Sequence, residues 1–113
     1  MHECLTPKNH RIMDYIGKKV IVRCNRAGVF FGTLKEYDNT TREAVLGYVR
    51  RVHYWEGAAS LSQMAMEGVG GNSRLTMVVP EMAVMEVIEI IPCTDKAVEC
   101  LENFEVWKIL KRK

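Results

Sequence analysis

The sequence lacks the features that mark several large classes of protein. Its four cysteines include no Cys-x-x-Cys pair, and its three histidines have no spacing typical of zinc ligands. We therefore expect reduced thiols, no metal site and no cofactor. The longest uncharged apolar-rich stretch, residues 57–66, is too short to span a membrane. No apolar run of signal-peptide length follows Met1, so we expect a soluble, intracellular protein.

Catalytic motifs are equally scarce. The sequence contains no P-loop, no paired metal-binding acids, and no Ser or Cys placed with a His in a recognisable nucleophile motif. His53 is the one side chain suited to general-base chemistry, and the sequence offers no partner for it. These absences favour a binding protein over an enzyme.

The 113 residues fit one domain, 1–113, and 48% of them are apolar, which is enough for a core without disulfides or metals. The net charge of +2 conceals an asymmetry. Residues 18–55 hold eight basic and three acidic groups, or +5, whereas residues 56–93 hold one basic and five acidic groups, or −4. A basic segment of this kind suits a phosphate-bearing partner.

Hydrophobic alternation and turn residues predict a chain of short strands. The expected strands are Lys18 to Cys24, Val29 to Tyr37, Glu43 to Trp55, Arg74 to Val79, and Ala83 to Ile91. Gly32 is expected to mark a bulge or a close backbone approach. In the third strand, alternation places Tyr48, Arg50 and Tyr54 on one face, and Arg51, His53 and Trp55 on the other.

Two helices are expected beside these strands. Ser60 to Gln63 has the form of a capping box, which predicts a short inserted helix that ends near Gly68. Thr94 and Asp95 suit the start of a C-terminal helix over 94–113, and residues 1–16 form a lead-in segment. The predicted fold class is α+β: a small twisted antiparallel sheet or partly open barrel of four to five strands, with one short inserted helix and a C-terminal helix.

The turn after the first strand is the first candidate site. A strand end with arginine, a polar turn and a small Ala-Gly pair can cradle a phosphate, because arginine donates bidentate bonds and turn amides point outward. The alternative is a solvated β-hairpin in which the glycine only permits the backbone angle. The candidate ligand-binding residues are Arg23, Asn25, Arg26, Ala27 and Gly28.

The end of the third strand is the second candidate site. Each face of this strand pairs a guanidinium with aromatic rings, which suits a nucleotide whose phosphate meets arginine and whose base stacks on a ring. The alternative is that one face is core and the other a solvated edge. The candidate ligand-binding residues here are Arg50, Arg51, His53, Tyr54 and Trp55.

Several short stretches between residues 17 and 97 carry a resemblance to a known family. They are Val22-Arg23, Ala27-Gly28-Val29, Gly32-Thr33-Leu34, Arg50-Arg51, Tyr54-Trp55, Ala59 to Ser62, and Val87 to Cys93. They resemble a family of small phage and prophage proteins, similar to the one that contains the Thoeris anti-defence sponge proteins. The sequence departs from that pattern at Asn25-Arg26, where Tyr-Ser is more usual, and at His53, where a larger aromatic is common.

The resemblance implies a function. Such sponges bind and sequester cyclic nucleotide immune signals, namely the cyclic ADP-ribose isomers of Thoeris and in some cases CBASS cyclic oligonucleotides, without cleaving them. It also implies a homo-oligomer with pockets between subunits, in the cytoplasm of the infected bacterial host. Carried over by motif, Arg23, Arg50, Arg51, Tyr54 and Trp55 would contact the ligand.

Two other interpretations stay open. A small Sm-like or SH3-like barrel that binds RNA or DNA would have the same strand pattern and the same basic segment. Salt dependence separates it from a sponge, because a long polyanion site releases many counterions and a pocket for one pyrophosphate releases few. The third interpretation is a phage inhibitor that acts only by protein–protein contact.

Overall fold

The computed structural model describes residues 12–109 of the chain. It contains six strands and two helices with bounds as follows: β1 Lys19–Cys24, β2 Gly28–Asp38, β3 Glu43–Tyr54, α2 Leu61–Glu67, β4 Arg74–Leu75, β5 Val79–Val84, β6 Val87–Pro92 and α3 Asp95–Glu102. Residues 12–16 form a helical turn before β1, and the rest of the predicted lead-in lies outside the described residues. No helix within residues 12–109 is long and apolar enough to cross a membrane.

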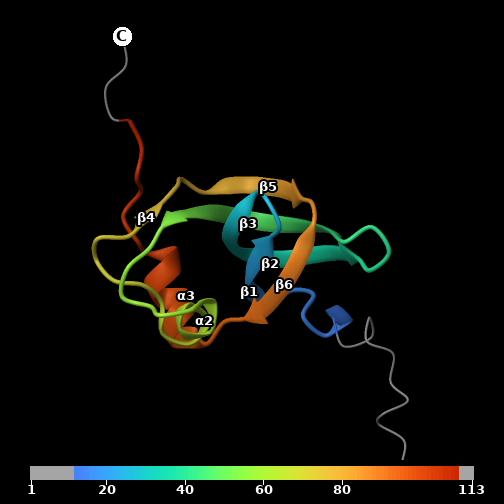
Figure 1. Cartoon of the computed structure of the whole chain (residues 1–113), viewed down its shortest axis with the longest axis horizontal. Coiled ribbons are helices and arrows are strands. Elements are labelled where there is room, and N and C mark those ends of the chain that lie inside the picture. The colour runs from blue at the N-terminus through green and yellow to red at the C-terminus, as the bar shows by residue number, and fades with distance from the viewer. Residues whose placement is uncertain (1–11, 110–113) are drawn as a thin grey trace, which may run out of the picture.

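The strands form one antiparallel sheet of order β4-β3-β2-β1-β6, with β5 paired to β3 beside this path. The sheet curves strongly, β5 and β6 diverge from the turn that joins them, and α2 and α3 lie together near one end (Figure 1). The predicted α+β class with an antiparallel, partly open sheet is confirmed, with six strands instead of four to five.

The extra strand arises where the sequence predicted one strand from Ala83 to Ile91. The chain turns at Met85 and Glu86, and Glu86 adopts a left-handed backbone conformation with φ of 56°. The prediction failed here because the apolar alternation continues through the turn, so the pattern alone does not reveal that the direction of the chain reverses.

Two clusters of buried side chains lie on the two faces of the sheet. The concave face holds the first, which includes Val22, Phe30 and Leu46. The opposite face holds the second, in which residues such as Phe31 pack against Met64 of α2 and Leu101 of α3. Adjacent residues of one strand serve different clusters because side chains alternate between the faces of a sheet.

A bulge in β3 changes which side chains share a face. The pairing of β2 with β3 shifts between Phe31 and Thr33, and Tyr48 has φ of 48° and is 70% exposed. The prediction that Tyr48 and Arg50 lie on one face was therefore wrong, because the extra residue at the bulge reverses the alternation beyond it. Gly32 confirms its prediction, since an added Cβ would lie 3.1 Å from the backbone of Val49.

The last helix is shorter than predicted. It ends at Glu102, and the chain then runs extended, with Val106 bridged to Leu75 in parallel. A continued helix would use the carbonyl of Leu101 for the amide of residue 105. That carbonyl instead accepts a hydrogen bond from the guanidinium of Arg50 at 2.8 Å. The bond from Arg50 to the Leu101 carbonyl thus accompanies the end of α3. Residues 110–113 of the predicted helix lie outside the described residues.

Candidate functional site

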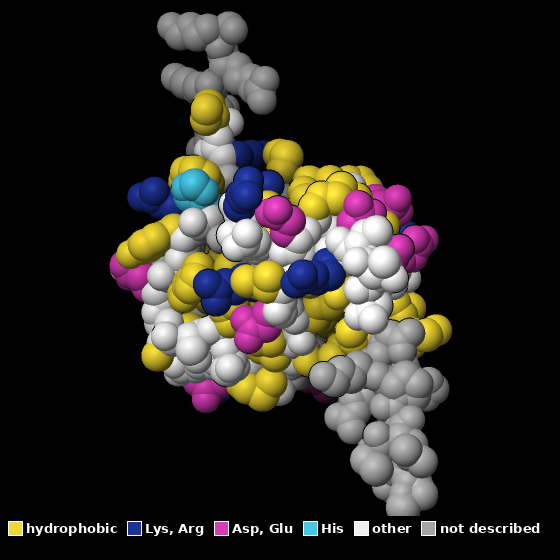
Figure 2. Space-filling view, turned by 45° about the vertical axis from the view of Figure 1, so that its right-hand side comes forward, with side chains coloured by type: hydrophobic (Ala, Val, Ile, Leu, Met, Phe, Trp, Pro, Cys, Tyr) yellow, Lys and Arg dark blue, Asp and Glu magenta, His cyan; other side chains and the backbone are white. Residues whose placement is uncertain are grey.

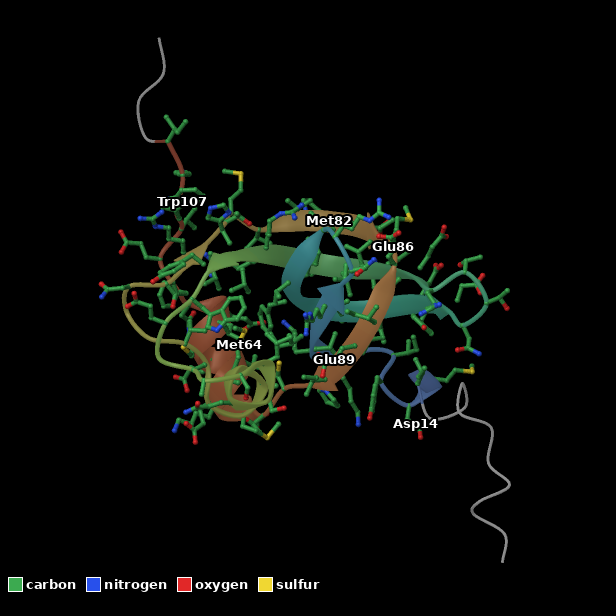
Figure 3. All side chains as sticks on the ribbon, viewed as in Figure 1. Asp14, Met64, Met82, Glu86, Glu89 and Trp107 are labelled. Carbon is green, nitrogen blue, oxygen red and sulfur yellow. The ribbon has the colours of Figure 1, made fainter. Side chains whose placement is uncertain are left out.

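Most of the predicted ligand-binding residues belong to one of two groups. One group lies around the β1–β2 turn and the other near the C-terminal segment, residues 103–109. Figure 3 shows this separation, with Glu86 beside the turns and Trp107 at the far side of the molecule. A single pocket that uses both groups of residues within one subunit is therefore not formed.

Three turns meet at one end of the barrel, and we call this region the turn site: Asn25, Arg26, Thr41, Arg42, Glu86 and Ile88. The amide of Asn25 donates to the carbonyl of Glu86 at 2.9 Å, and the amide of Val87 donates to the carbonyl of Arg42 at 3.0 Å. A pocket of about 250 Å³ lies between the turns. The backbone bonds therefore hold three separate turns around one hollow, which Arg42 lines, while Arg26 lines a neighbouring groove.

Two arginines of the turn site have guanidinium groups that the fold leaves largely unused. Arg26 is 83% exposed, and its Nε lies 3.8 Å from a carboxylate oxygen of Glu86. Arg42 makes no ion pair with any residue in the described range. Arg42 and Glu86 both adopt left-handed backbone conformations, with φ of 61° and 56°. Such conformations cost of order 1 kcal/mol at non-glycine residues, and the surrounding bonds maintain them.

Arg51 contacts the β1–β2 turn and the neighbouring ring of Phe30. Its guanidinium carbon lies 4.6 Å from the centre of the Phe30 ring, and its Nη1 donates to the carbonyl of Ala27. Gly28, with φ of 108°, provides the left-handed residue at the end of this turn. A groove of about 510 Å³ runs from Arg26 and Arg51 to Met82 and Met85 of the opposite side. Figure 2 shows basic side chains on this end of the molecule interspersed with hydrophobic and acidic ones.

Arg50 does not lie where the sequence placed it. It is 2% exposed, in contact with the second buried cluster, and its burial lowers the pKa of its guanidinium. Its N–H groups donate to four backbone carbonyls, those of Thr76 at 2.7 Å, Leu101 at 2.8 Å, and Leu75 and Glu105 at 3.4 Å. The predicted ligand contact is corrected to a structural role, because the side chain is buried and its guanidinium bonds backbone carbonyls.

The rest of β3 contributes to what we call the aromatic cluster, made of His53, Tyr54, Arg74 and Trp107. The rings of His53 and Trp107 stack with centroids 4.6 Å apart and planes at 16°. The guanidinium carbon of Arg74 lies 5.5 Å from the Trp107 centroid and 5.8 Å from that of Tyr54. The cluster therefore combines exposed rings with a cation.

The two remaining predicted residues lie apart from both groups. Trp55 is half-buried and packs against the second buried cluster. Arg23 is exposed on β1, with Glu89 of β6 as its neighbour across the sheet. Neither residue lines the turn site or belongs to the aromatic cluster.

Sequence reasoning missed three basic or aromatic side chains of these surfaces: Arg42, Arg74 and Trp107. Arg42 falls between two predicted strands, and the sequence shows no partner for it. Arg74 was the one base of an acidic segment, and Trp107 was assigned to a helix. Their proximity to the predicted residues depends on strand pairing between distant segments, which local patterns do not report.

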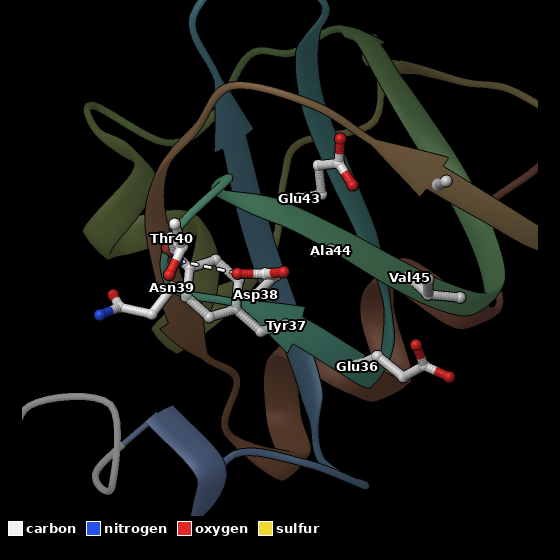
Figure 4. A pocket seen from close by; sticks show the side chains of 9 residues that line it. Glu36, Tyr37, Asp38, Asn39, Thr40, Glu43, Ala44 and Val45 are labelled. Carbon is white, nitrogen blue, oxygen red and sulfur yellow. Dashed lines mark hydrogen bonds between the residues drawn. The ribbon is translucent and has the colours of Figure 1, made fainter.

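A further hollow of the described structure lies on an acidic surface. It has a volume of about 530 Å³ and is lined by residues of β2, β3 and their connecting turn, together with Ala83 (Figure 4). Its charged side chains are Glu36, Asp38 and Glu43. Asp38 already accepts hydrogen bonds from the amides of Thr40 and Thr41 at 2.8 and 3.2 Å. The acidic lining disfavours any phosphate-bearing ligand here.

Comparison with known proteins defines the family and the fold. The family described as "Domain of unknown function (DUF6948)" matches residues 17–101, so the chain belongs to this family. No curated protein matches the sequence.

Two similar solved structures are of Sm proteins. One is a heptameric archaeal Sm protein, whose structure was discussed for its implications for the eukaryotic snRNP core; it has 20% identity and a TM-score of 0.50, over 75% of this chain and 98% of that one. The other is the P. aerophilum SmAP1 heptamer, with 19% identity and a TM-score of 0.53, over 80% of this chain and 99% of that one. At these identities the likeness concerns the fold.

Proposed function

We propose that this DUF6948 protein is a self-associating, Sm-like protein that binds single-stranded RNA or DNA through the turn site. The observation that carries the proposal is the convergence of three turns that present two exposed arginines. The ion pair of Arg26 with Glu86 is long, at 3.8 Å, and Arg42 forms none with a described residue. Guanidinium groups bind phosphate bidentately, and turn amides add further donors. The Sm proteins of similar fold support the nucleic-acid interpretation over the sponge.

Self-association follows from the free edges of the sheet. Among the described residues β5 pairs with β3 alone and β6 with β1 alone, so each has an outer edge without a partner strand. Exposed apolar side chains, Met85 and Ile88, lie at these edges or in the turn that joins them. An unpaired apolar edge is a template for another strand. Association of copies through these edges is compatible with the heptamers named for the structural neighbours.

Repetition of the turn site would strengthen a weak local site. One pair of arginines binds a phosphate group with modest affinity in water, whereas several linked copies bind one strand with a high effective concentration. Self-association and nucleic-acid binding are therefore parts of one proposal.

The cyclic nucleotide sponge stays a prediction of the sequence resemblance, as does an inhibitor that acts by protein contact alone. The sponge prediction included Arg50 among its ligand contacts, and this side chain is buried. A cyclic nucleotide would have to be held between two subunits by the remaining predicted residues, such as the exposed Arg26 and the half-buried Arg51.

Binding can be tested with labelled single-stranded RNA, single-stranded DNA and cyclic nucleotides that include the cyclic ADP-ribose isomers, over a range of salt concentrations. The variant Arg26→Gln/Arg42→Gln should weaken binding of the single strand by about tenfold or more, since each charge-assisted bond contributes about 1.5–3 kcal/mol. The salt dependence should also become shallower, because fewer counterions are released.

The matched control is Lys18→Gln/Lys96→Gln, which removes the same charge from exposed positions outside the turn site. An equal loss in both variants would assign the effect to net charge and contradict the turn site. Tight, weakly salt-dependent binding of a cyclic nucleotide without binding of RNA or DNA would overturn the proposal in favour of the sponge.

Self-association can be tested separately by analytical ultracentrifugation. Ile88→Lys places a charge on the free edge of β6 and should shift the protein toward the monomer. Met66→Lys places the same charge on an exposed position of α2 and should leave the mass unchanged. A monomeric wild-type protein would contradict the assembly part of the proposal.

A further inference from the structure

The aromatic cluster lies away from the turn site and brings together three segments that are distant in sequence. His53 and Tyr54 end β3, Arg74 begins β4, and Trp107 belongs to the C-terminal segment. Trp107 is 44% exposed and Tyr54 is 43% exposed, although rings of this size contribute most to stability when they are buried. The fold thus keeps large rings at the surface beside a cation.

Backbone bonds hold the C-terminal segment in place. The amide of Trp107 donates to the carbonyl of Leu75 at 2.9 Å, directly after the bridge between Val106 and Leu75. The guanidinium of Arg50 bonds both Leu75 and Glu105, so it joins β4 to the same segment. Trp107 is therefore presented by a fastened segment and not by a free end, which lowers the entropy lost when a ligand stacks on it.

Charges of both signs lie around the rings. Arg74 is the cation, and Glu56 and Glu105 are the nearby acids. The carboxylate of Glu56 accepts bonds from the hydroxyl of Tyr54 and from the side-chain amide of Asn72. The bond to Tyr54 contributes most to lowering the pKa of Glu56, and it raises the pKa of Tyr54. Arg74 makes no ion pair with a described residue, so its guanidinium faces rings and solvent.

A groove lies next to the rings, and the sequence after Trp107 is basic. The groove, of about 260 Å³, runs between residues 71–74 and residues 104–107. Four of the six residues that follow Trp107 in the sequence are basic: Lys108, Lys111, Arg112 and Lys113. The sequence thus places several basic residues, which could contact phosphates, directly after the ring of Trp107.

We propose that the aromatic cluster is a second binding site, where an unpaired nucleobase stacks on the exposed rings and Arg74 contacts the adjacent phosphate. The inference rests on the proposed function, because the ligand is the same single strand that the turn site contacts. It deepens that function by excluding duplexes, since paired bases have no free ring face to offer. Stacking tolerates any base, so the site selects strandedness and not sequence.

Tryptophan emission tests the site directly. In the background Trp55→Phe, Trp107 is the one remaining tryptophan, since the chain has two. Single-stranded RNA or DNA should quench this emission at the concentration at which it binds, and a duplex of the same sequence should not. Trp107→Leu and Arg74→Gln should each weaken binding by about tenfold, the usual effect of losing one stacked base.

The matched control is Ile109→Ala, which removes an exposed apolar side chain from the same segment without touching the cluster. It should bind the single strand as the wild type does. Thermal unfolding of each variant establishes that the protein is folded, and Arg74→Gln leaves all three rings in place, so loss of binding by that variant does not reflect a lost packing surface.

The outcomes separate the two sites. If the turn-site variant loses binding while saturating single strand leaves Trp107 emission unchanged, the stacking site is overturned and the proposed function stands. If Trp107→Leu loses binding and Arg26→Gln/Arg42→Gln does not, the turn site is wrong and the aromatic cluster is the binding surface. Equal quenching by the duplex, or no binding of any strand, overturns the stacking site.

Discussion

The turn site and the C-terminal end of the barrel both contain arginines, and they use them differently. At the turn site Arg26 and Arg42 stay exposed at the surface. At the C-terminal end Arg50 is buried and spends its donors on backbone carbonyls, while Arg74 lies against rings. The adjacent residues Arg50 and Arg51 of β3 therefore have unlike environments, because they project from opposite faces of one strand.

The difference follows from how the backbone N–H and C=O groups of each end are hydrogen-bonded. The three turns form backbone hydrogen bonds with one another, as in the bond from the amide of Asn25 to the carbonyl of Glu86. At the other end the chain leaves α3 and runs beside a strand of only two residues, and the carbonyls of Leu101 and Glu105 accept bonds from the guanidinium of Arg50. A buried carbonyl without a donor is costly, and a guanidinium can supply several bonds at once.

The largest effect on stability is expected when Arg50, the buried arginine of the C-terminal end, is replaced. Arg50→Met should reduce the free energy of unfolding by about 3 kcal/mol or more, since it removes donors from several buried carbonyls. Arg51→Met should cost about 1 kcal/mol, because it removes one exposed bond and one contact with the Phe30 ring. Urea unfolding measures both values. Similar losses at the two positions would contradict the difference between the two ends.

A medium effect is expected at Gly57, which supports the loop that carries Arg74. Gly57 and Gly17 have nearly the same left-handed φ, 83° and 89°. A Cβ at Gly57 would lie 2.6 Å from the amide nitrogen of Gly70, whereas a Cβ at Gly17 would meet nothing within 4 Å. Gly17→Ala should therefore cost about 1 kcal/mol for backbone strain alone.

Gly57→Ala should lower the free energy of unfolding by about 1–3 kcal/mol more than Gly17→Ala does, because two backbone segments must move apart. It should also weaken ligand-free stacking of His53 on Trp107, which NMR ring-current shifts of His53 would report. A change in those shifts for Gly17→Ala as well would assign the effect to general destabilisation and not to the loop.

Local signals in the sequence predicted the turns and caps well. Ser60 accepts the amide of Gln63, and Thr94 accepts the amide of Ala97, as the capping patterns indicated. The β1–β2 turn and the special role of Gly32 were also predicted. These features depend on residues a few positions apart, so a single sequence contains the information that specifies them.

Features that depend on distant pairing were not predicted. The bulge at Tyr48 arises where β3 pairs with β2, and it reverses the face on which Arg50 lies. The early end of α3 coincides with a bond from Arg50 to a carbonyl about half the chain away. The composition of the candidate sites changed for the same reason, since Arg42, Arg74 and Trp107 reach them only through tertiary structure.

The smallest expected effect concerns the pKa of two cysteine thiols, Cys24 and Cys93. Burial raises the pKa of the Cys24 thiol, but the charge of Arg51 lowers it again in part. Burial raises the pKa of Cys93 from 9.0 to about 12, and no cation opposes it. The folded state therefore holds the Cys93 proton over a range in which the unfolded chain has released it.

The stability contributed by Cys93 should be complete below pH 9.0 and should fall as the pH rises from 9.0 toward the raised value of about 12. Unfolding releases a proton in that range, so alkali favours the unfolded state. Cys93→Ser removes this titration, and the pH dependence of its unfolding should be less steep by about a few tenths of a kcal/mol per pH unit, since partial exposure screens the effect. Parallel curves for the variant and the wild type, measured by urea unfolding across this range, would mean that Cys93 ionises as readily in the folded protein as in the unfolded chain.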